Sequence, residues 1–92
     1  KITEPAIDLG IVMAIVSSYK NRMVDNRMLV FGEVGLSGEV RGVSMAGQRL
    51  QEAKKLGFTT CVMPAVCMKG LKNMDGIKVI GVKSVQDAID LI

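Results

Sequence analysis

The chain has 92 residues and a mass of 9.9 kDa, the size of one domain. Hydrophobic residues make up 49% of it and charged residues 23%, which excludes an intrinsically disordered chain. The longest apolar run, Ile11 to Val16, is far shorter than the ~18 residues that a membrane-spanning helix needs. No basic stretch followed by an apolar stretch marks a signal peptide at the amino end.

Histidine is absent, which excludes every catalytic dyad or triad that uses a histidine base and every histidine metal site. The two cysteines, Cys61 and Cys67, are too few for a four-ligand zinc site. We expect them to be free buried thiols, and a disulfide between them is the alternative. Tryptophan is absent, and one tyrosine with two phenylalanines gives a poor platform for stacking on nucleic-acid bases.

The formal net charge of +3 comes entirely from the second half of the chain. Residues 1–46 carry five basic and five acidic groups, whereas residues 47–92 carry seven basic and four acidic groups. This imbalance permits an acidic partner such as nucleic acid, although a solvated basic face is the simpler interpretation. The glycines match no phosphate-binding motif, and isolated carboxylates near a turn do not make a metal site. We therefore predict no cofactor and no metal for these residues.

The first half of the sequence predicts a helix followed by a strand and a hairpin. Pro5 suits the first position of a helix. Apolar residues between positions 6 and 19 cover nearly the whole helix circumference, so we expect this helix to be buried on most sides. A polar loop over residues 20–27 leads to an apolar strand over residues 28–33. Ser37-Gly38 then predicts a tight hairpin turn.

The second half alternates helices with short apolar strands. Residues 44–56 have helical spacing, with Ser44 as the expected cap and Gly57 as the expected left-handed end. After them we predict, in order, a strand over residues 58–63 that Pro64 ends, a loop over 65–75 with one helical turn around 68–74, a strand over 77–82, and a helix over 85–92 capped by Ser84. Such alternation predicts a partly parallel sheet, and no linker divides the chain.

Several separated segments resemble one known family in the right order: KITEPAIDLGIVMAIVSSYKNR, VFGEVGLSGEVRGV, RLQEAKKLGF and GIKVIGVKSVQDAIDLI. They resemble the carboxy-terminal domain of the RadA (Sms) family of bacterial DNA repair proteins, which is similar to the proteolytic domain of Lon protease. The resemblance covers residues 1–92 as one Lon protease-like domain. It implies an α+β fold, a mixed α/β sandwich that is ribosomal protein S5 domain 2-like. In that fold strands precede the first helix. Because the chain starts at Lys1, close to the predicted helix, we expect a carboxy-terminal fragment that lacks those strands.

Lon-type peptidases use a Ser–Lys dyad, and the resemblance places other residues at both positions. Their serine follows a Gly-Pro at the start of a helix, and here Glu4-Pro5-Ala6 puts Ala6 at that position. Their lysine falls on Gly47 when the stretch that begins at Phe31 is laid over theirs. Neither Ala6 nor Gly47 supplies a nucleophile or a base, so we predict no catalytic residues and no enzyme activity for this domain. A Lon-type Ser–Lys peptidase is the alternative that these two residues oppose.

The resemblance also implies the setting in which this domain works. The parent protein is expected to be a DNA-dependent ATPase of recombinational repair and branched-DNA processing in the bacterial cytoplasm, with ATP, Mg and Zn held by other domains. This domain is expected to be a scaffold in a homo-oligomer, a hexamer in the full protein, that contacts DNA weakly and does not contact a membrane. We predict the DNA contacts to be Lys54, Lys55, Lys69 and Lys72. Self-association is expected through a sheet edge or through Met68 and Met74. A stand-alone nucleic-acid-binding module is a further hypothesis.

Overall fold

The computed structural model describes residues 5–21, 27–71 and 75–92. In these ranges β1 (Met28–Val30), β4 (Thr60–Pro64) and β5 (Lys78–Val82) form a parallel sheet of order β1-β4-β5. A separate antiparallel hairpin is formed by β2 (Glu33–Val34) and β3 (Val40–Arg41). The helices are α1 (Asp8–Tyr19), α2 (Ala46–Lys55) and α3 (Val85–Ile89), with 3-10 turns η1 (Pro5–Ile7) and η2 (Ala65–Met68).

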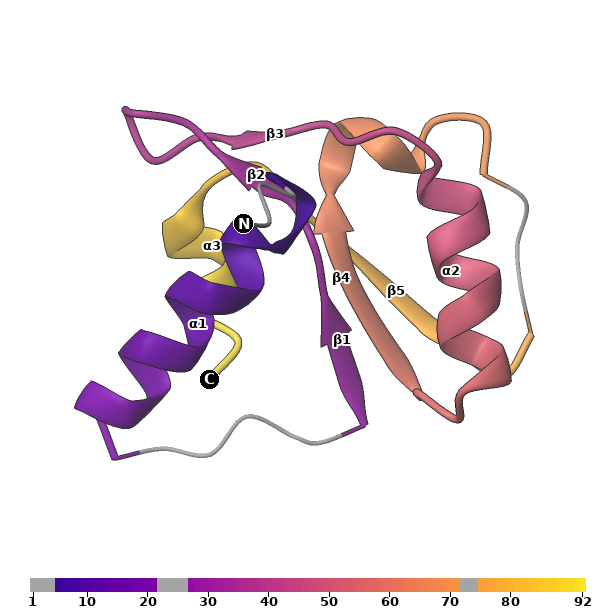
Figure 1. Ribbon diagram of the computed structural model, residues 1–92, viewed down its shortest axis with the longest axis horizontal. Coiled ribbons are helices and arrows are strands. Elements are labelled where there is room, and N and C mark those ends of the chain that lie inside the picture. The colour runs from indigo at the N-terminus through magenta and orange to yellow at the C-terminus, as the bar shows by residue number, and fades with distance from the viewer. Residues whose placement is uncertain (1–4, 22–26, 72–74) are drawn as a thin grey trace.

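Helices cover both faces of the parallel sheet, with α2 on one side and α1 and α3 on the other (Figure 1). Successive side chains of a strand point to opposite faces, so Cys61 and Met63 of β4 pack with α2 whereas Val62 packs with α1 and α3. All three are buried, and burial on both faces explains why β4 is apolar from Cys61 to Pro64. This arrangement confirms the predicted α+β class and the partly parallel sheet.

The predicted strand over residues 28–33 is in fact two strands, because the chain leaves the parallel sheet at Phe31 and Gly32. The Gly32 N–H donates to the Ala6 carbonyl at 2.7 Å, and the Leu9 N–H donates to the Gly32 carbonyl at 2.9 Å. A Cβ atom on Gly32 would lie 3.1 Å from Val40 Cγ1 and 3.3 Å from Leu9 Cδ2. The backbone of Gly32 therefore holds the start of the first helix instead of extending the strand.

The predicted hairpin is confirmed between β2 and β3. Gly38 has a φ of 80°, and its N–H donates to the Gly35 carbonyl at 3.1 Å. The Glu39 carboxylate folds over this turn, where it accepts from Ser37 N at 3.0 Å and from Arg41 Nε and Nη2 at 3.2 and 3.1 Å. Hydrogen bonds from its own backbone amide, from the Arg41 side chain and from the Ser37 N–H hold the pKa of Glu39 below its usual value. The turn is thus fixed by a local charged network.

The two predicted helix caps have different outcomes. Ser84 does cap α3, since its Oγ accepts from the Asp87 N–H at 3.2 Å. Ser44 does not cap α2: the N-cap is Met45, which is left-handed at φ 63° and ψ 34° and makes no side-chain cap bond. The Ser44 carbonyl instead accepts from Arg49 Nε at 3.2 Å. The sequence does not signal this start because non-glycine residues seldom adopt positive φ.

Two helical boundaries also differ from the prediction. The helical turn expected around residues 68–74 lies earlier, at η2, and residues 72–74 are outside the described ranges. The last helix ends at Ile89 instead of continuing to residue 92. Gly57 follows α2 with a φ of 93°, which confirms the left-handed end expected there.

The expectation that the first helix is buried on most sides is wrong for the described structure. Its contacts with α3, β1 and β2 bury a single face, which carries Leu9, Met13 and Ser17. The buried Ser17 hydroxyl is satisfied by donating to the Ala14 carbonyl at 3.0 Å. Four large side chains of η1 and α1 remain exposed: Ile7 at 47%, Ile11 at 49%, Ile15 at 63% and Tyr19 at 92%. Among the described helices, none is long and apolar enough to cross a bilayer.

Candidate functional site

The two positions that the resemblance assigns to a Lon-type dyad begin helices on opposite faces of the sheet, at the edge where β4 ends (Figure 1). Ala6 lies in η1 and is 2% exposed, and its carbonyl is held by the Gly32 N–H. Gly47 is the second residue of α2. A Cβ atom there would lie 3.5 Å from Leu71 Cδ2, an ordinary contact, so packing does not require glycine at this position. A methyl group and a hydrogen atom at these positions cannot perform Ser–Lys hydrolysis.

The structure separates the lysines that the sequence suggested as DNA contacts. Lys54 and Lys55 end α2 at the edge where the parallel strands begin, whereas Lys69 follows η2 at the edge where they end (Figure 1). A helix of 10 residues is about 15 Å long, so these lysines do not form one cluster. Lys72 lies outside the described residues.

Two further basic residues join Lys54 and Lys55 at the edge where the strands begin. Lys78 starts β5, and its N–H donates to the Thr59 carbonyl at 2.9 Å. Arg27 precedes β1, and its carbonyl accepts from the Thr59 N–H at 2.9 Å. All of these side chains are exposed, and we call Arg27, Lys54, Lys55 and Lys78 the basic edge. Sequence reasoning did not single out Arg27 and Lys78, which the parallel pairing of β1 and β5 with β4 brings to this edge of the sheet. By the alternation of the strand, the Lys78 side chain lies on the face that α1 and α3 cover, whereas Lys54 and Lys55 end the helix on the other face.

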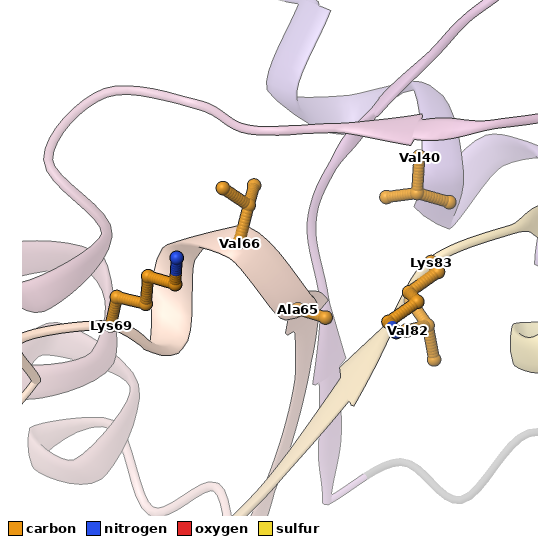
Figure 2. A pocket seen from close by; sticks show the side chains of 6 residues that line it. All are labelled: Val40, Ala65, Val66, Lys69, Val82 and Lys83. Atoms are coloured by element: carbon orange, nitrogen blue, oxygen red, sulfur yellow. The ribbon is translucent and has the colours of Figure 1, made fainter.

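A pocket of about 290 Å³ lies at the opposite edge, between β3, η2 and the end of β5. We call it the junction pocket; Figure 2 shows its lining residues, which are Val40, Ala65, Val66, Lys69, Val82 and Lys83. Lys69 is one of the lysines that the sequence predicts to contact DNA, whereas the sequence does not single out Lys83. The lining is aliphatic apart from these two lysines, so the pocket combines apolar walls with positive charge.

The cysteines are free thiols rather than a disulfide. Cys61 is fully buried in β4, and desolvation by burial raises the pKa of its thiol to about 11. Cys67 is half-buried in η2, where its Sγ accepts from the Val43 N–H at 3.4 Å. Over residues 5–21, 27–71 and 75–92, no three metal-ligating side chains come together.

The class of protein follows from a family model. The model described as subunit ChlI of Mg-chelatase matches residues 2–66, and the chain belongs to that family. Over nearly its whole length the chain is also similar to the bacterial DNA repair protein RadA. It is 46% identical to RadA of Halalkalibacterium halodurans over 91 residues, which are 99% of this chain and 20% of that protein. It is 47% identical to RadA of Bacillus subtilis over 89 residues, or 97% of this chain and 19% of that protein.

A third relative, RadA of Chlamydia trachomatis, is 44% identical over 94 residues, which cover 100% of this chain and 21% of that protein. These relatives confirm the predicted resemblance to the RadA family. The chain spans about one fifth of the length of the relatives that it matches. The RadA relatives cover 97–100% of the chain, including β5 and α3, whereas the family model stops at residue 66.

Proposed function

We propose that the chain is a non-catalytic, Lon-like scaffold domain of a RadA-type DNA repair protein in the bacterial cytoplasm. The observation that carries this proposal is the pair Ala6 and Gly47 at the dyad positions of a chain whose relatives are named DNA repair proteins. Its topology, with helices on both faces of a small parallel sheet and a hairpin at one end, supports a ribosomal protein S5 domain 2-like fold. ATP, Mg and Zn belong in this proposal to other parts of the longer protein, which assembles as a hexamer.

DNA contact by this domain is proposed at the basic edge. Lys54, Lys55 and Lys78 are exposed there, and lysine ammonium groups bind phosphates as point charges. Phe58, which follows α2 at this edge, is half-buried against the core, so the contact is proposed to read the phosphate backbone and not the bases. A few phosphate contacts per domain give weak binding, which several domains in one assembly would strengthen.

The DNA contact is tested by the salt dependence of binding to a fluorescein-labelled duplex, measured by anisotropy in the longer protein. Replacing Lys54 and Lys55 with alanine is expected to reduce the slope of log K against log salt by up to ~2, about 0.9 for each lost phosphate contact. The matched control is Lys69→Ala with Lys83→Ala, which removes the same charge from the other edge and should leave the slope unchanged. Equal effects of the two double variants would show that only net charge matters and would remove the basic edge from the proposal.

The absence of peptidase chemistry is tested with an unfolded protein substrate and a serine-reactive probe. We expect no turnover by the native chain or by Ala6→Ser, because a serine without a base stays protonated and weakly nucleophilic. We expect none from Ala6→Ser with Gly47→Lys either, since a lysine base needs a fixed position and a lowered pKa. Turnover by the purified native chain would favour the peptidase alternative and overturn the scaffold proposal.

A further inference from the structure

The junction pocket has the composition of a site for an amphipathic anion. Val40, Val66 and Val82 supply branched aliphatic walls, and Figure 2 shows Lys69 and Lys83 on opposite sides of Val66 and Ala65. Both lysines are exposed, and within the described ranges neither of them forms an ion pair. These two ammonium groups lie beside an apolar surface and have no carboxylate partner. They can therefore bind a ligand that carries both an apolar group and a negative charge.

The walls of this pocket are fixed by close packing. The Met68 side chain and the backbone of Ala65 lie against Gly81 of β5, where a Cβ atom would come within 3.1 Å of Ala65 Cα. On the other side of η2, Val66 Cγ1 would lie 3.0 Å from a Cβ atom on Gly42. The turn is thus held between two glycines, so the pocket exists before a ligand arrives, which lowers the entropic cost of binding.

Two backbone N–H groups at the pocket already have partners. The Val40 N–H donates to the Lys83 carbonyl at 2.9 Å, and the Lys83 N–H donates to Asp87 Oδ2 at 3.0 Å. These backbone donors are therefore not available to cradle a phosphate. No aromatic side chain lines the pocket, so a base has no stacking partner there. The lining suits an aliphatic side chain with an adjacent carboxylate better than a nucleotide.

We propose that the junction pocket binds a peptide segment of a partner protein in which an aliphatic side chain stands beside a carboxylate. The aliphatic group fills the space between Val40, Val66 and Val82, and Lys69 and Lys83 bind the carboxylate. The pocket volume of about 290 Å³ is at the lower limit for ligand pockets. A pocket of this size holds one aliphatic side chain and the adjacent carboxylate. The carboxylate is either the carboxy terminus of the partner or an acidic side chain. This site is separate from the basic edge and adds a protein-docking role to the proposed scaffold.

The test uses two short synthetic peptides titrated into the 15N-labelled chain, with the amide shifts of Val40, Val66 and Val82 as the readout. One peptide ends in Ile-Leu with a free carboxylate, and the other is amidated and carries an internal Asp-Leu pair. We expect saturable changes in the chemical shifts of these amides with one of the two peptides. The peptide that causes them shows whether the carboxylate is a carboxy terminus or an acidic side chain. A third peptide serves as the control: it is the amidated form of the Ile-Leu peptide and should bind more weakly because it lacks the charge.

The variants separate this site from the DNA contact. Lys69→Ala and Lys83→Ala should each weaken binding of the active peptide by up to about fivefold, the range of an exposed ion pair. Val66→Glu places a repelling charge at an exposed position and should abolish the shifts, whereas the double alanine variant at Lys54 and Lys55 should bind normally. The proposal is overturned if neither peptide shifts these amides, if the lysine variants bind as well as the native chain, or if only single-stranded DNA produces the shifts. Failure of the salt-slope experiment would leave this result untouched.

Discussion

The two thiols of this chain lie in very different surroundings. Cys61 is 0% exposed among apolar side chains of β4, and burial raises its pKa to about 11. Because the raised pKa belongs to the folded state, the thiol form stabilises the fold at neutral pH. That contribution is lost as the pH rises from the usual thiol value of 9.0 towards about 11.

This difference predicts selective alkylation of Cys67. At about pH 8 only on the order of one Cys61 thiol in a thousand is ionised, and it is also inaccessible, so iodoacetamide should modify Cys67 first. Intact mass followed by peptide mapping measures the order of labelling, and a sample in urea should label both cysteines at similar rates. Equal rates in the folded chain would contradict the buried position of Cys61.

Glycine has opposite roles in two elements, and the difference predicts opposite effects of alanine. At Gly81 a Cβ atom would press on Ala65 Cα and on the Met68 side chain, so Gly81→Ala should displace η2 and destabilise the fold by about 1–3 kcal/mol. At Gly47 a Cβ atom has room beside Leu71, so Gly47→Ala should stabilise α2 by up to about 1 kcal/mol. Urea unfolding measures both changes. A stabilising Gly81→Ala would mean that η2 does not pack on β5 as described.

Most elements could be predicted from local patterns, and the exceptions have tertiary causes. Apolar periodicity is enough to predict the helices and strands in order, and Gly57 and Ser84 mark boundaries through their own backbone or side chain. The break at Gly32 depends on a hydrogen bond to Ala6, which is distant in sequence. The left-handed start of α2 at Met45 has no residue signal at all. Local reasoning fails where contacts between distant segments decide the conformation.

The candidate sites show the same division. The family resemblance predicts Ala6 and Gly47 as the dyad positions, and this assignment stays a prediction. The place of Lys54 and Lys55 in the last turn of a helix could be predicted from the sequence. Lys78 and Lys83 lie at opposite ends of β5, at two different surfaces of the molecule. The sequence could not predict this, because the pairing of β5 with β4 decides which residues lie near each lysine. The split of the basic residues into two groups is a property of the topology.

At the scale of the whole molecule, the outer face of η1 and α1 groups four exposed large apolar side chains of the described residues. Ile7, Ile11, Ile15 and Tyr19 follow one another at four-residue spacing, and no charged residue interrupts the helix between Asp8 and Lys20. Beside them lies an open hollow of about 450 Å³ lined by Ala14, Ile15, Ser18 and Tyr19. In an antiparallel pair of two copies the tyrosine of one helix could fill such a hollow. Asp8 of each copy would then face Lys20 of the other.

Self-association of the chain through this face is the prediction at this scale, and association through the sheet edge or the loop methionines stays a prediction beside it. Met68 is 40% exposed, and Met74 lies outside the described residues. Sedimentation at tens of micromolar should detect dimers, and Ile15→Lys should reduce them because an exposed position tolerates the charge while an apolar interface does not. Met68→Lys is the matched control and should leave the dimers unchanged. A monomer at every concentration, or dimers lost only with Met68→Lys, would contradict the α1 interface.

The parallel sheet also bears on how the chain folds. Its pairings join β1 to β4 and β4 to β5, and each requires a long crossover, whereas the hairpin of β2 and β3 closes locally. Non-local pairing is slow, so the uncharged, apolar β4 segment stays unpaired while the hairpin is already formed. Such a segment promotes aggregation unless charges or proline flank it. Lys54 and Lys55 lie shortly before β4 and Pro64 lies at its end, so we expect them to oppose aggregation of the nascent chain before the central strand pairs with its neighbours.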